Sequence, residues 1–485
     1  MFVIVVLACA LGSLTQTAMN SMLGGIEDSF GTDDATSQWL TTIYMLGIGM
    51  TVPVVSHLSR RFDMRSMVLI SLGFSLVGGI VAVFAPSFWV LLGARVLQSI
   101  GTGITLPLLQ TIAMVRFPKG QNATAMGIAG IAMGFAPNIG PLIGGALVGT
   151  LGWRSFYWIF LGIVVLLLAA CLVLLRGEQR PAMDGVLDMP SFILSIVGFG
   201  AILLGFSNAS SMGINNPWVW IQIAVGAAGI AWFVIRQRRC AHPLISMKVF
   251  SSRTYAMSFV CQNLLFASFM GITLIVPLFV MNVTDMGPVE AGMVFLPATV
   301  LAVIFNPLAG IASDRIGYVP VIIFGAAVMS TGSVSMVFMG SDTPLWLIMT
   351  LQGIRGVGVS TLVGPLVSWG LSRLTPDVMV DGSAFFTAIR QACASFGTAL
   401  MMACIVMVAG TSGLLGYQVA LGLSAVFSLA LLACVLISFF GFGDRPKEGE
   451  AEDIEKESGV LKETLTADIG DNMTADVGGK EGSRQ

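Results

Sequence analysis

Charged residues are scarce in this sequence. Only 10% of the 485 residues are Asp, Glu, Lys or Arg, whereas 55% are apolar. A soluble domain carries about 25% charged residues, so the composition excludes an ordinary soluble globular domain. The mean hydropathy of +0.89 instead places most of the chain in a lipid bilayer.

The motifs of common enzymes and of ATP-driven pumps are also missing. The sequence has no GxSxG elbow, no P-loop, no HExxH pair and no paired carboxylates inside an apolar run. Its seven cysteines form no CxxC pair, and His57 and His242 lie far apart near the ends of apolar runs. We therefore expect no enzyme, no cofactor and no metal site, and any active transport must be secondary.

Fourteen apolar runs, from about residue 2 to about residue 442, are long enough to cross a membrane as helices. With the loop after the second run placed in the cytoplasm, sixteen Lys and Arg residues of the loops fall on the inner side and only Arg154 falls outside. This strong asymmetry orients the chain, because basic residues collect in cytoplasmic loops. An even number of spans then predicts that both termini are cytoplasmic.

The second half of the sequence repeats part of the first at an offset of 254 residues. PVVSHLSRRFD (Pro53–Asp63) aligns with PLAGIASDRIG (Pro307–Gly317), and LQSIG (Leu97–Gly101) aligns with LQGIR (Leu351–Arg355). Two six-helix halves related by duplication are typical of transporters, whose substrate site lies near the midplane between the halves. Fourteen spans leave two extra helices, at about 189–236, between the halves.

These residues resemble the Major Facilitator Superfamily, and more closely its fourteen-helix drug:proton antiporter branch, over about residues 10–442. GIASDRIG (Gly310–Gly317) is similar to the loop motif that follows the second helix of each half in that family, and RVLQSIGTG (Arg95–Gly103) to its fourth-helix motif. GFAPNIGPLIGG (Gly134–Gly145) resembles the fifth-helix motif of the exporters. SQWLTTIYML (Ser37–Leu46) and GWRSFYWIF (Gly152–Phe160) also look like members of that branch.

The resemblance implies an all-α membrane protein with the major facilitator fold: two six-helix bundles plus two extra helices. We expect an N-terminal bundle at 1–180, the inserted pair with a cytoplasmic linker at 181–252, a C-terminal bundle at 253–443 and a cytoplasmic tail at 444–485. The tail carries 12 acidic and 6 basic residues with few large apolar ones, which predicts disorder.

The fifth-helix motif is rich in residues that weaken helices. Glycine allows close approach of helix backbones in lipid, and proline removes a backbone donor and bends the helix. The motif is therefore either a simple packing device or, as the resemblance favours, a bent helix at the interface where the two halves rock. Its residues are Gly134, Pro137, Gly140, Pro141, Gly144 and Gly145.

The sequence departs from the family in the first helix, where Thr15 stands at the place of the usual acidic residue in LTQTAMN (Leu14–Asn20). No acid outside the tail falls in the middle of a span. If protons drive transport, the best remaining carboxylates of the first half lie near the outer mouth, in the set Glu27, Asp28, Asp33 and Asp34.

Three arginines do lie within spans: Arg95, Arg355 and Arg390. An unpaired cation in the bilayer interior costs at least a few kcal/mol. They either bind carbonyls and brace helices, or make a positive cavity that favours anionic or neutral amphipathic substrates over cations. The candidate cavity residues are Thr15, Gln16, Asn20, Tyr44, Arg95, Gln98, Asn138, Gln262, Asn263, Phe266, Arg355, Phe385 and Arg390, although plain helix packing remains an alternative for each of them.

The resemblance also implies a cytoplasmic gate, because in that family the acid of the loop after the second helix meets the start of a helix in the other half when the cytoplasmic side is closed. In the second half, Asp314 should lie near the start of the fifth helix, around Asn122–Thr124, because a carboxylate suits a helix N-terminus. In the first half Arg60 stands at the equivalent position, so we expect Arg60 or Arg61 to pair with Asp377 or Asp381, unless the arginines are only topology signals. Ser59, Asp63 and Arg315 complete the candidate gate.

Together these features predict a secondary transporter of the plasma membrane, most simply a proton-coupled exporter of amphipathic drugs or metabolites that works by alternating access. We expect a monomer whose partners are a small-molecule substrate, protons and the lipid bilayer, with no nucleic acid. The alternatives are a transporter-like sensor, or a lipid or organic-anion flippase without proton coupling.

Overall fold

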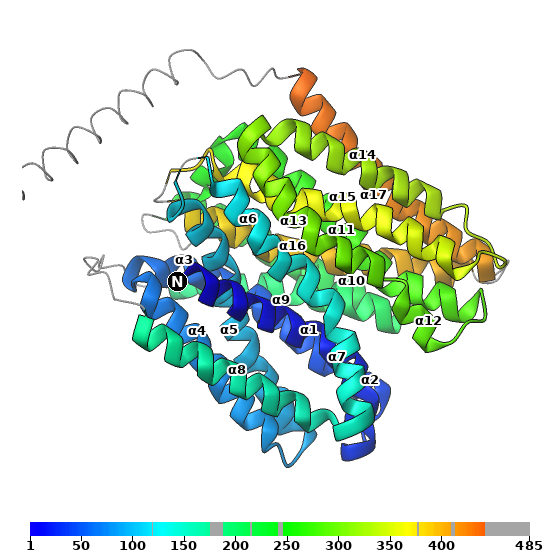
Figure 1. Cartoon of the computed structure of the whole chain (residues 1–485). Coiled ribbons are helices and arrows are strands. Elements are labelled where there is room, and N and C mark those ends of the chain that lie inside the picture. Colours follow the sequence, from blue (N-terminus) through cyan, green and yellow to red (C-terminus); the bar gives the residue numbers. More distant parts are fainter. Residues whose placement is uncertain are drawn as a thin grey trace, which may run out of the picture. The chain divides into compact units, whose positions relative to one another are not determined.

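The computed structural model describes residues 1–118, 120–174, 188–213, 216–240, 246–375, 378–408 and 413–441. Within them every regular element is a helix (Figure 1). Thirteen helices are long and apolar enough to cross a membrane, and α3 (Trp39–Arg61), which is less apolar, is as long as several of these. The expected all-α fold with fourteen long helices is thus confirmed. The side on which the termini lie, and the predicted tail at 444–485, which falls outside the described residues, stay predictions.

The helices of the first half match the expected spans. They are α1 (Phe2–Phe30), the short α2 (Asp34–Ser37), α3, α4 (Met64–Val83), α5 (Phe88–Val115), the fifth span built from α6 (Asn122–Gly130), η1 (Ile131–Phe135) and α7 (Ala136–Leu151), and α8 (Trp153–Leu174).

The inserted pair consists of α9 (Met189–Met212) and α10 (Pro217–Arg239). Glycines allow the two backbones to touch, since a Cβ added at Gly226 would lie 2.5 Å from the amide nitrogen of Ile202. Arg236 of α10 bridges to Asp188, which precedes α9, at 2.8 Å. The hydrogen bond from Arg236 lowers the pKa of Asp188 to about 2, so this carboxylate is ionised at physiological pH.

The second half begins after a short linker helix. Its elements are η2 (Met247–Ser251), α11 (Arg253–Asn282), α12 (Pro288–Met293), α13 (Leu296–Ile316), α14 (Tyr318–Met336), α15 (Leu345–Leu371), α16 (Met379–Val408) and α17 (Gly413–Gly441). Helix α16 contacts α3 and α5 of the first half and α9 of the inserted pair. It therefore joins all three parts.

The fifth span packs against two different neighbours, α13 and α1 (Figure 1). Toward the start of the span, a Cβ on Gly127 would lie 2.5 Å from the carbonyl oxygen of Asn306 in α13. Toward its end, a Cβ on Gly144 would lie 2.6 Å from the carbonyl oxygen of Ala18 in α1, and one on Gly140 would lie 2.1 Å from Oγ1 of Thr17. Both contacts require a residue without a side chain, so the span can touch α1 and α13 at once.

A π-helical turn, η1, separates these two stretches, and the amide of Ala136 bonds to the carbonyl of Ile131. The prolines follow at once: Pro137 leaves the carbonyl of Met133 without its usual helical donor, and Pro141 lies inside α7. π-turns inside α-helices are frequent at functional sites. The weakened region thus divides the part of the span that packs on α13 from the part that packs on α1.

Two adjacent glycines of the motif, Gly144 and Gly145, allow a matched test of this packing. We expect Gly144→Ala to cost about 1–3 kcal/mol, because the added methyl group meets the backbone of α1. Gly145→Ala should be neutral or slightly stabilising, because the nearest atom to its new Cβ is 3.8 Å away, on Ser21, and alanine favours the helix by about 1 kcal/mol. Thermal unfolding of the two variants in detergent is the measurement. Equal melting temperatures would contradict the assignment.

Candidate functional site

Two of the three interior arginines bind backbone carbonyls. Arg95 on α5 is fully buried, and its guanidinium donates to the carbonyls of Leu40 (3.2 Å) and Thr15 (3.3 Å). It also donates to Oε1 of Gln98 (3.2 Å) and lies 4.1 Å from the centre of the Tyr44 ring. Arg95 is thus satisfied inside the first half and ties α5 to α1 and α3.

Arg355 repeats this arrangement in the second half. Its guanidinium is fully buried on α15 and donates to the carbonyl of Ser268 in α11 at 3.0 Å and to Oγ of Ser333 at 3.2 Å. With the offset of 254 residues, Ser268 corresponds to Leu14, next to the Thr15 carbonyl that binds Arg95. In each half, therefore, an arginine of the fourth helix holds the first helix at nearly the same carbonyl, although the two arginines are not at equivalent positions.

For Arg95 and Arg355, these contacts favour the bracing alternative over a role in binding a ligand. The guanidinium groups of Arg95 and Arg355 are occupied by carbonyls and side chains of their own halves. Bracing is therefore the role that the structure supports for both of them.

Arg390 is different. It lies on α16 and is only 5% exposed, yet its Nε atom has no hydrogen-bond partner among the residues that the structure describes. Its guanidinium lies 4.7 Å from the centre of the Phe266 ring on α11, and the helix that carries it contacts α3 and α5 of the first half. Arg390 therefore lies between the two halves, and an aromatic face provides only part of what a buried cation needs.

Unpartnered amide groups lie on the same helix as Phe266. Gln262, one turn before Phe266, is buried, and neither its Oε1 nor its Nε2 has a partner. Asn263 donates to the carbonyl of Phe259, but its Oδ1 is also unpartnered. Because residues four apart share a helix face, Gln262 and Phe266 present an amide and a ring to the same side of α11.

The other expected cavity residues lie elsewhere. Thr15 is buried and bonds to the carbonyl of Leu11, whereas Asn20 is exposed and accepts a hydrogen bond from Thr41. Tyr44 donates to the carbonyl of Gly12, and Gln16 is half-buried. Phe385 faces a second pocket, beside the inserted pair, rather than the centre. The side chain of Asn138 lies outside the described residues.

Sequence reasoning missed Asn306 on α13. Its Oδ1 is buried without a partner, and it lines a cavity of about 20 Å³ together with Gln352 and Arg355. The unpartnered Oε1 of Gln352 and this Oδ1 suit one bridging water, which such a volume can hold. A polar residue directly before Pro307 in an apolar span was the available signal.

The gate contact of the second half is present. Asp314, near the end of α13, accepts hydrogen bonds from the amides of Ala123 (3.0 Å) and Thr124 (2.7 Å) and from Oγ1 of Thr124 (2.6 Å). The carboxylate thus lies on the N-terminus of α6, where unpaired N–H groups concentrate positive potential. The helices approach closely here, since a Cβ on Gly310 would lie 2.3 Å from the carbonyl oxygen of Ala123.

Two further contacts join the halves at this end. Thr111 on α5 and Ser383 on α16 share a hydrogen bond of 2.9 Å, and the hydroxyl of Ser368 on α15 lies 3.5 Å from the sulfur of Met114. The structure is therefore closed at the end that the arginine-rich loops assign to the cytoplasm.

The gate residues of the first half are less fully described. Asp63 caps α4 by accepting from the amide of Ser66, Ser59 bonds to the carbonyl of Ser56, and Arg61 and Arg315 are exposed. The side chain of Arg60 and the whole of Asp377 lie outside the described residues, so the predicted pairing stays a prediction.

One acid is more deeply buried than the sequence indicated. Asp381, expected in an inner loop, lies in the first turn of α16 with 1% of its surface exposed, and it accepts from the amide of Ser246 at 3.0 Å. Among the acids expected at the outer mouth, Asp28 is exposed, Glu27 is half-buried and Asp33 binds Thr36, while the side chain of Asp34 lies outside the description.

Comparison with known proteins identifies the family. The family model "Major Facilitator Superfamily" matches residues 5–398 and 258–471. The chain belongs to the Major Facilitator Superfamily. It is therefore a transporter rather than an enzyme, and a multi-pass integral protein of the plasma membrane.

The relatives place this family member among bacterial transporters. It is 31% identical over 441 residues to the uncharacterized MFS-type transporter YcnB of Bacillus subtilis, covering 90% of this chain and 93% of that one. It is 31% identical over 410 residues to the lincomycin resistance protein LmrB of the same organism, covering 83% and 84% of the two chains. The fold is similar to that of the human organic anion transporter MFSD10, with a TM-score of 0.63, 14% identity, and 89% and 98% coverage.

The Asp314 contact can be tested by its effect on the closed state. Replacing the carboxylate by an amide in Asp314→Asn removes the charge from three hydrogen bonds, and bonds to charged groups contribute about 1.5–3 kcal/mol. We expect the population open at this end to rise about tenfold or more. Distances between spin labels at the exposed residues Gln121 and Ile316, in a background without the native cysteines, measure that population.

The neighbouring change Arg315→Gln is the control, because it alters the charge by one unit at an exposed side chain. It should leave the distance distribution unchanged. If both variants shift the distribution equally, the effect is one of surface charge and the Asp314 contact does not hold the gate.

Proposed function

We propose that this member of the Major Facilitator Superfamily exports amphipathic drugs or metabolites by alternating access, that it favours neutral and anionic compounds over cationic ones, and that a proton gradient drives it. The name of the related lincomycin resistance protein supports drug export. The absence of any P-loop from the sequence supports a gradient as the energy source.

The preference for anions rests on Arg390. The other two interior arginines already bind carbonyls, whereas the Nε of Arg390 has no partner among the described residues and its guanidinium lies against the Phe266 ring. Carbonyl or carboxylate oxygens of a ligand would complete its hydrogen bonds, and the planar guanidinium suits a carboxylate in particular. A cationic ligand would be repelled at the same place, because no described acid lies against Arg390 to offset its charge.

Phe266 and Gln262 would complete the recognition of an amphipathic compound. The ring offers an apolar face, and the amide of Gln262 offers one donor and one acceptor that are otherwise unused. Because the site involves α11 and α16 of one half, and α16 contacts α3 and α5 of the other, rocking of the halves would change its access, which is the requirement for alternating access.

Flux through proteoliposomes tests this function. The substrates should be two drug-sized amphipathic compounds that differ only in carrying a carboxylate or an amine. We expect uphill transport of the anion in the presence of a pH gradient and its loss when an ionophore collapses the gradient. Uphill transport that persists without the gradient would contradict proton coupling, and absence of flux for all compounds would favour a sensor.

Variants of the arginines test the site itself. Arg390→Gln should lower anion flux about tenfold or more, in line with the 1.5–3 kcal/mol of a charged hydrogen bond, and should leave the flux of the amine compound unchanged or raised. Arg390→Lys should restore part of the anion flux. Arg355→Gln is the control: it removes a brace, so it should lower thermal stability and reduce both fluxes alike. Equal losses for both compounds in Arg390→Gln would contradict the proposal.

A further inference from the structure

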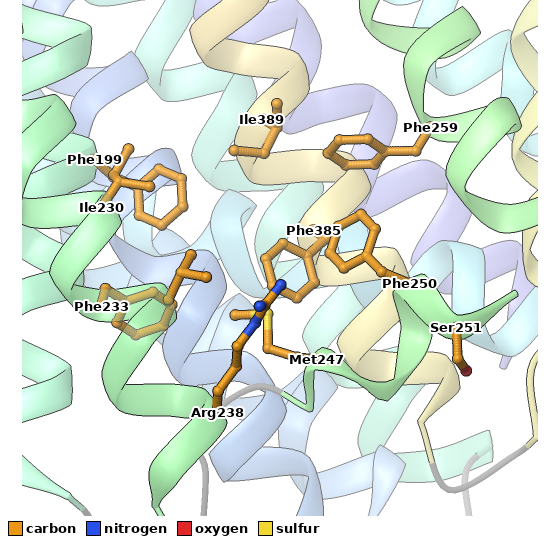
Figure 2. Close-up of a pocket in the computed structure, with 11 residues that line it drawn as sticks. Phe199, Ile230, Phe233, Arg238, Met247, Phe250, Ser251, Phe259, Phe385 and Ile389 are labelled. Atoms are coloured by element: carbon orange, nitrogen blue, oxygen red, sulfur yellow. The ribbon is translucent and has the colours of Figure 1, made fainter. Parts of the chain in front are cut away.

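A second pocket lies outside the central region, between the inserted helix pair and the second half. It has a volume of about 520 Å³, within the range of small-molecule sites. Five phenylalanines from five different elements form much of its wall (Figure 2): Phe199, Phe233, Phe250, Phe259 and Phe385. Such a wall binds a flexible apolar ligand without selecting a particular shape.

The polar side chains among its described lining are Arg238 and Ser251. Figure 2 shows the guanidinium of Arg238 extending from α10 toward the ring of Phe385. Arg238 is an exposed residue of the last turn of α10, whereas Arg236, half a turn earlier, is already bound to Asp188. The pocket thus combines an apolar chamber with a cation at one end.

The surroundings of the pocket belong to the membrane. On α10, Trp232 and Ile235 are 65% and 52% exposed, as expected of side chains that face lipid tails. The same end of α10 carries Arg236, Arg238 and Arg239, so it lies where the sequence places the cytoplasmic surface of the bilayer. The pocket therefore lies beside a lipid-facing helix, and Arg238 lies at the end of that helix where anionic headgroups would be found.

We infer that this pocket binds one anionic phospholipid of the cytoplasmic leaflet, with an acyl chain against the phenylalanines and the phosphate on Arg238. Arginine binds phosphate through two parallel N–H groups, and anionic lipids are attracted to basic residues next to a span. The inference goes beyond the transport function and does not depend on the identity of the substrate.

The lipid would support the helix that carries the central arginine. Phe385 and Ile389 of α16 line the pocket, whereas Arg390, directly after Ile389, lies against Phe266 on α11. A bound acyl chain would fill the space between α16 and the inserted pair. This gives α9 and α10 a function: they enclose a lipid site on the side of α16 that carries Phe385 and Ile389.

Native mass spectrometry of the full-length protein tests the site directly. Delipidated protein is titrated with phosphatidylglycerol and, separately, with phosphatidylcholine of the same chains. We expect one phosphatidylglycerol to be retained at collision energies that remove the others. Phosphatidylcholine should be held about fivefold more weakly, because its choline cation offsets the charge of the phosphate and removes the net attraction to Arg238. Equal retention of the two lipids would overturn the proposal.

Arg238→Gln should lose the retained phosphatidylglycerol, and Arg239→Gln, the same charge change at a neighbouring exposed residue that does not line the pocket, should keep it. Equal losses would show attraction by surface charge alone and would contradict a built site.

A third variant tests the chamber rather than the charge. Ile230→Trp fills the pocket from α10 and should also release the lipid, while Arg238→Lys should retain part of the binding. If Ile230→Trp still retained the lipid, the acyl chain would not enter the pocket. Displacement of the lipid by a transported anionic compound would make the pocket a substrate site instead. Melting temperatures of all variants show whether each is folded.

Discussion

A cation inside a bilayer needs hydrogen-bond acceptors, and this need determines how the buried arginines of this protein are arranged. An isolated charge in hydrocarbon is costly, and no described acid lies beside the three interior arginines. Arg95 and Arg355 meet the requirement with backbone carbonyls, and in doing so each ties the fourth helix of its half to the first. The same chemistry thus braces the helices of each half, as the proposed alternating access requires of units that move against each other. Arg390 lies between these units and is the one whose hydrogen bonds are incomplete.

The alternating access proposed for this transporter requires contacts between the halves that can form and break without a large cost in free energy. Asp314 binds the N-terminus of α6 through three hydrogen bonds at the surface end, where water can replace them. The fifth span begins at this contact. Its glycines pack the first stretch against α13 and the second stretch against α1, and the π-turn η1 lies between the two stretches. A break in helical hydrogen bonding at that point lets one stretch move relative to the other.

Much of the fold could be predicted because its signals are local. Apolar runs predicted the long helices, and the resemblance of the repeated loop to the family's motif predicted the place of Asp314. The site was harder, because a partner in space decides what a buried polar residue does. The sequence identified three interior arginines. It could not show that two of them donate hydrogen bonds to backbone carbonyls, Arg95 to that of Thr15 and Arg355 to that of Ser268. It assigned Asp381 to the loop before a helix expected to begin near Ser383, whereas α16 begins at Met379 and its first turn buries this carboxylate. Phe385 looked central, but its face of α16 is turned to the inserted pair.

The central claim is that Arg390 binds the transported anion, and an experimental structure with a transported carboxylate compound bound tests it most directly. The account predicts carboxylate oxygens about 2.7–2.9 Å from the guanidinium nitrogens of Arg390, with the apolar part of the compound on Phe266 and no ligand contact to Arg95 or Arg355. A compound bound away from Arg390, with the guanidinium still resting on Phe266 alone, would contradict it.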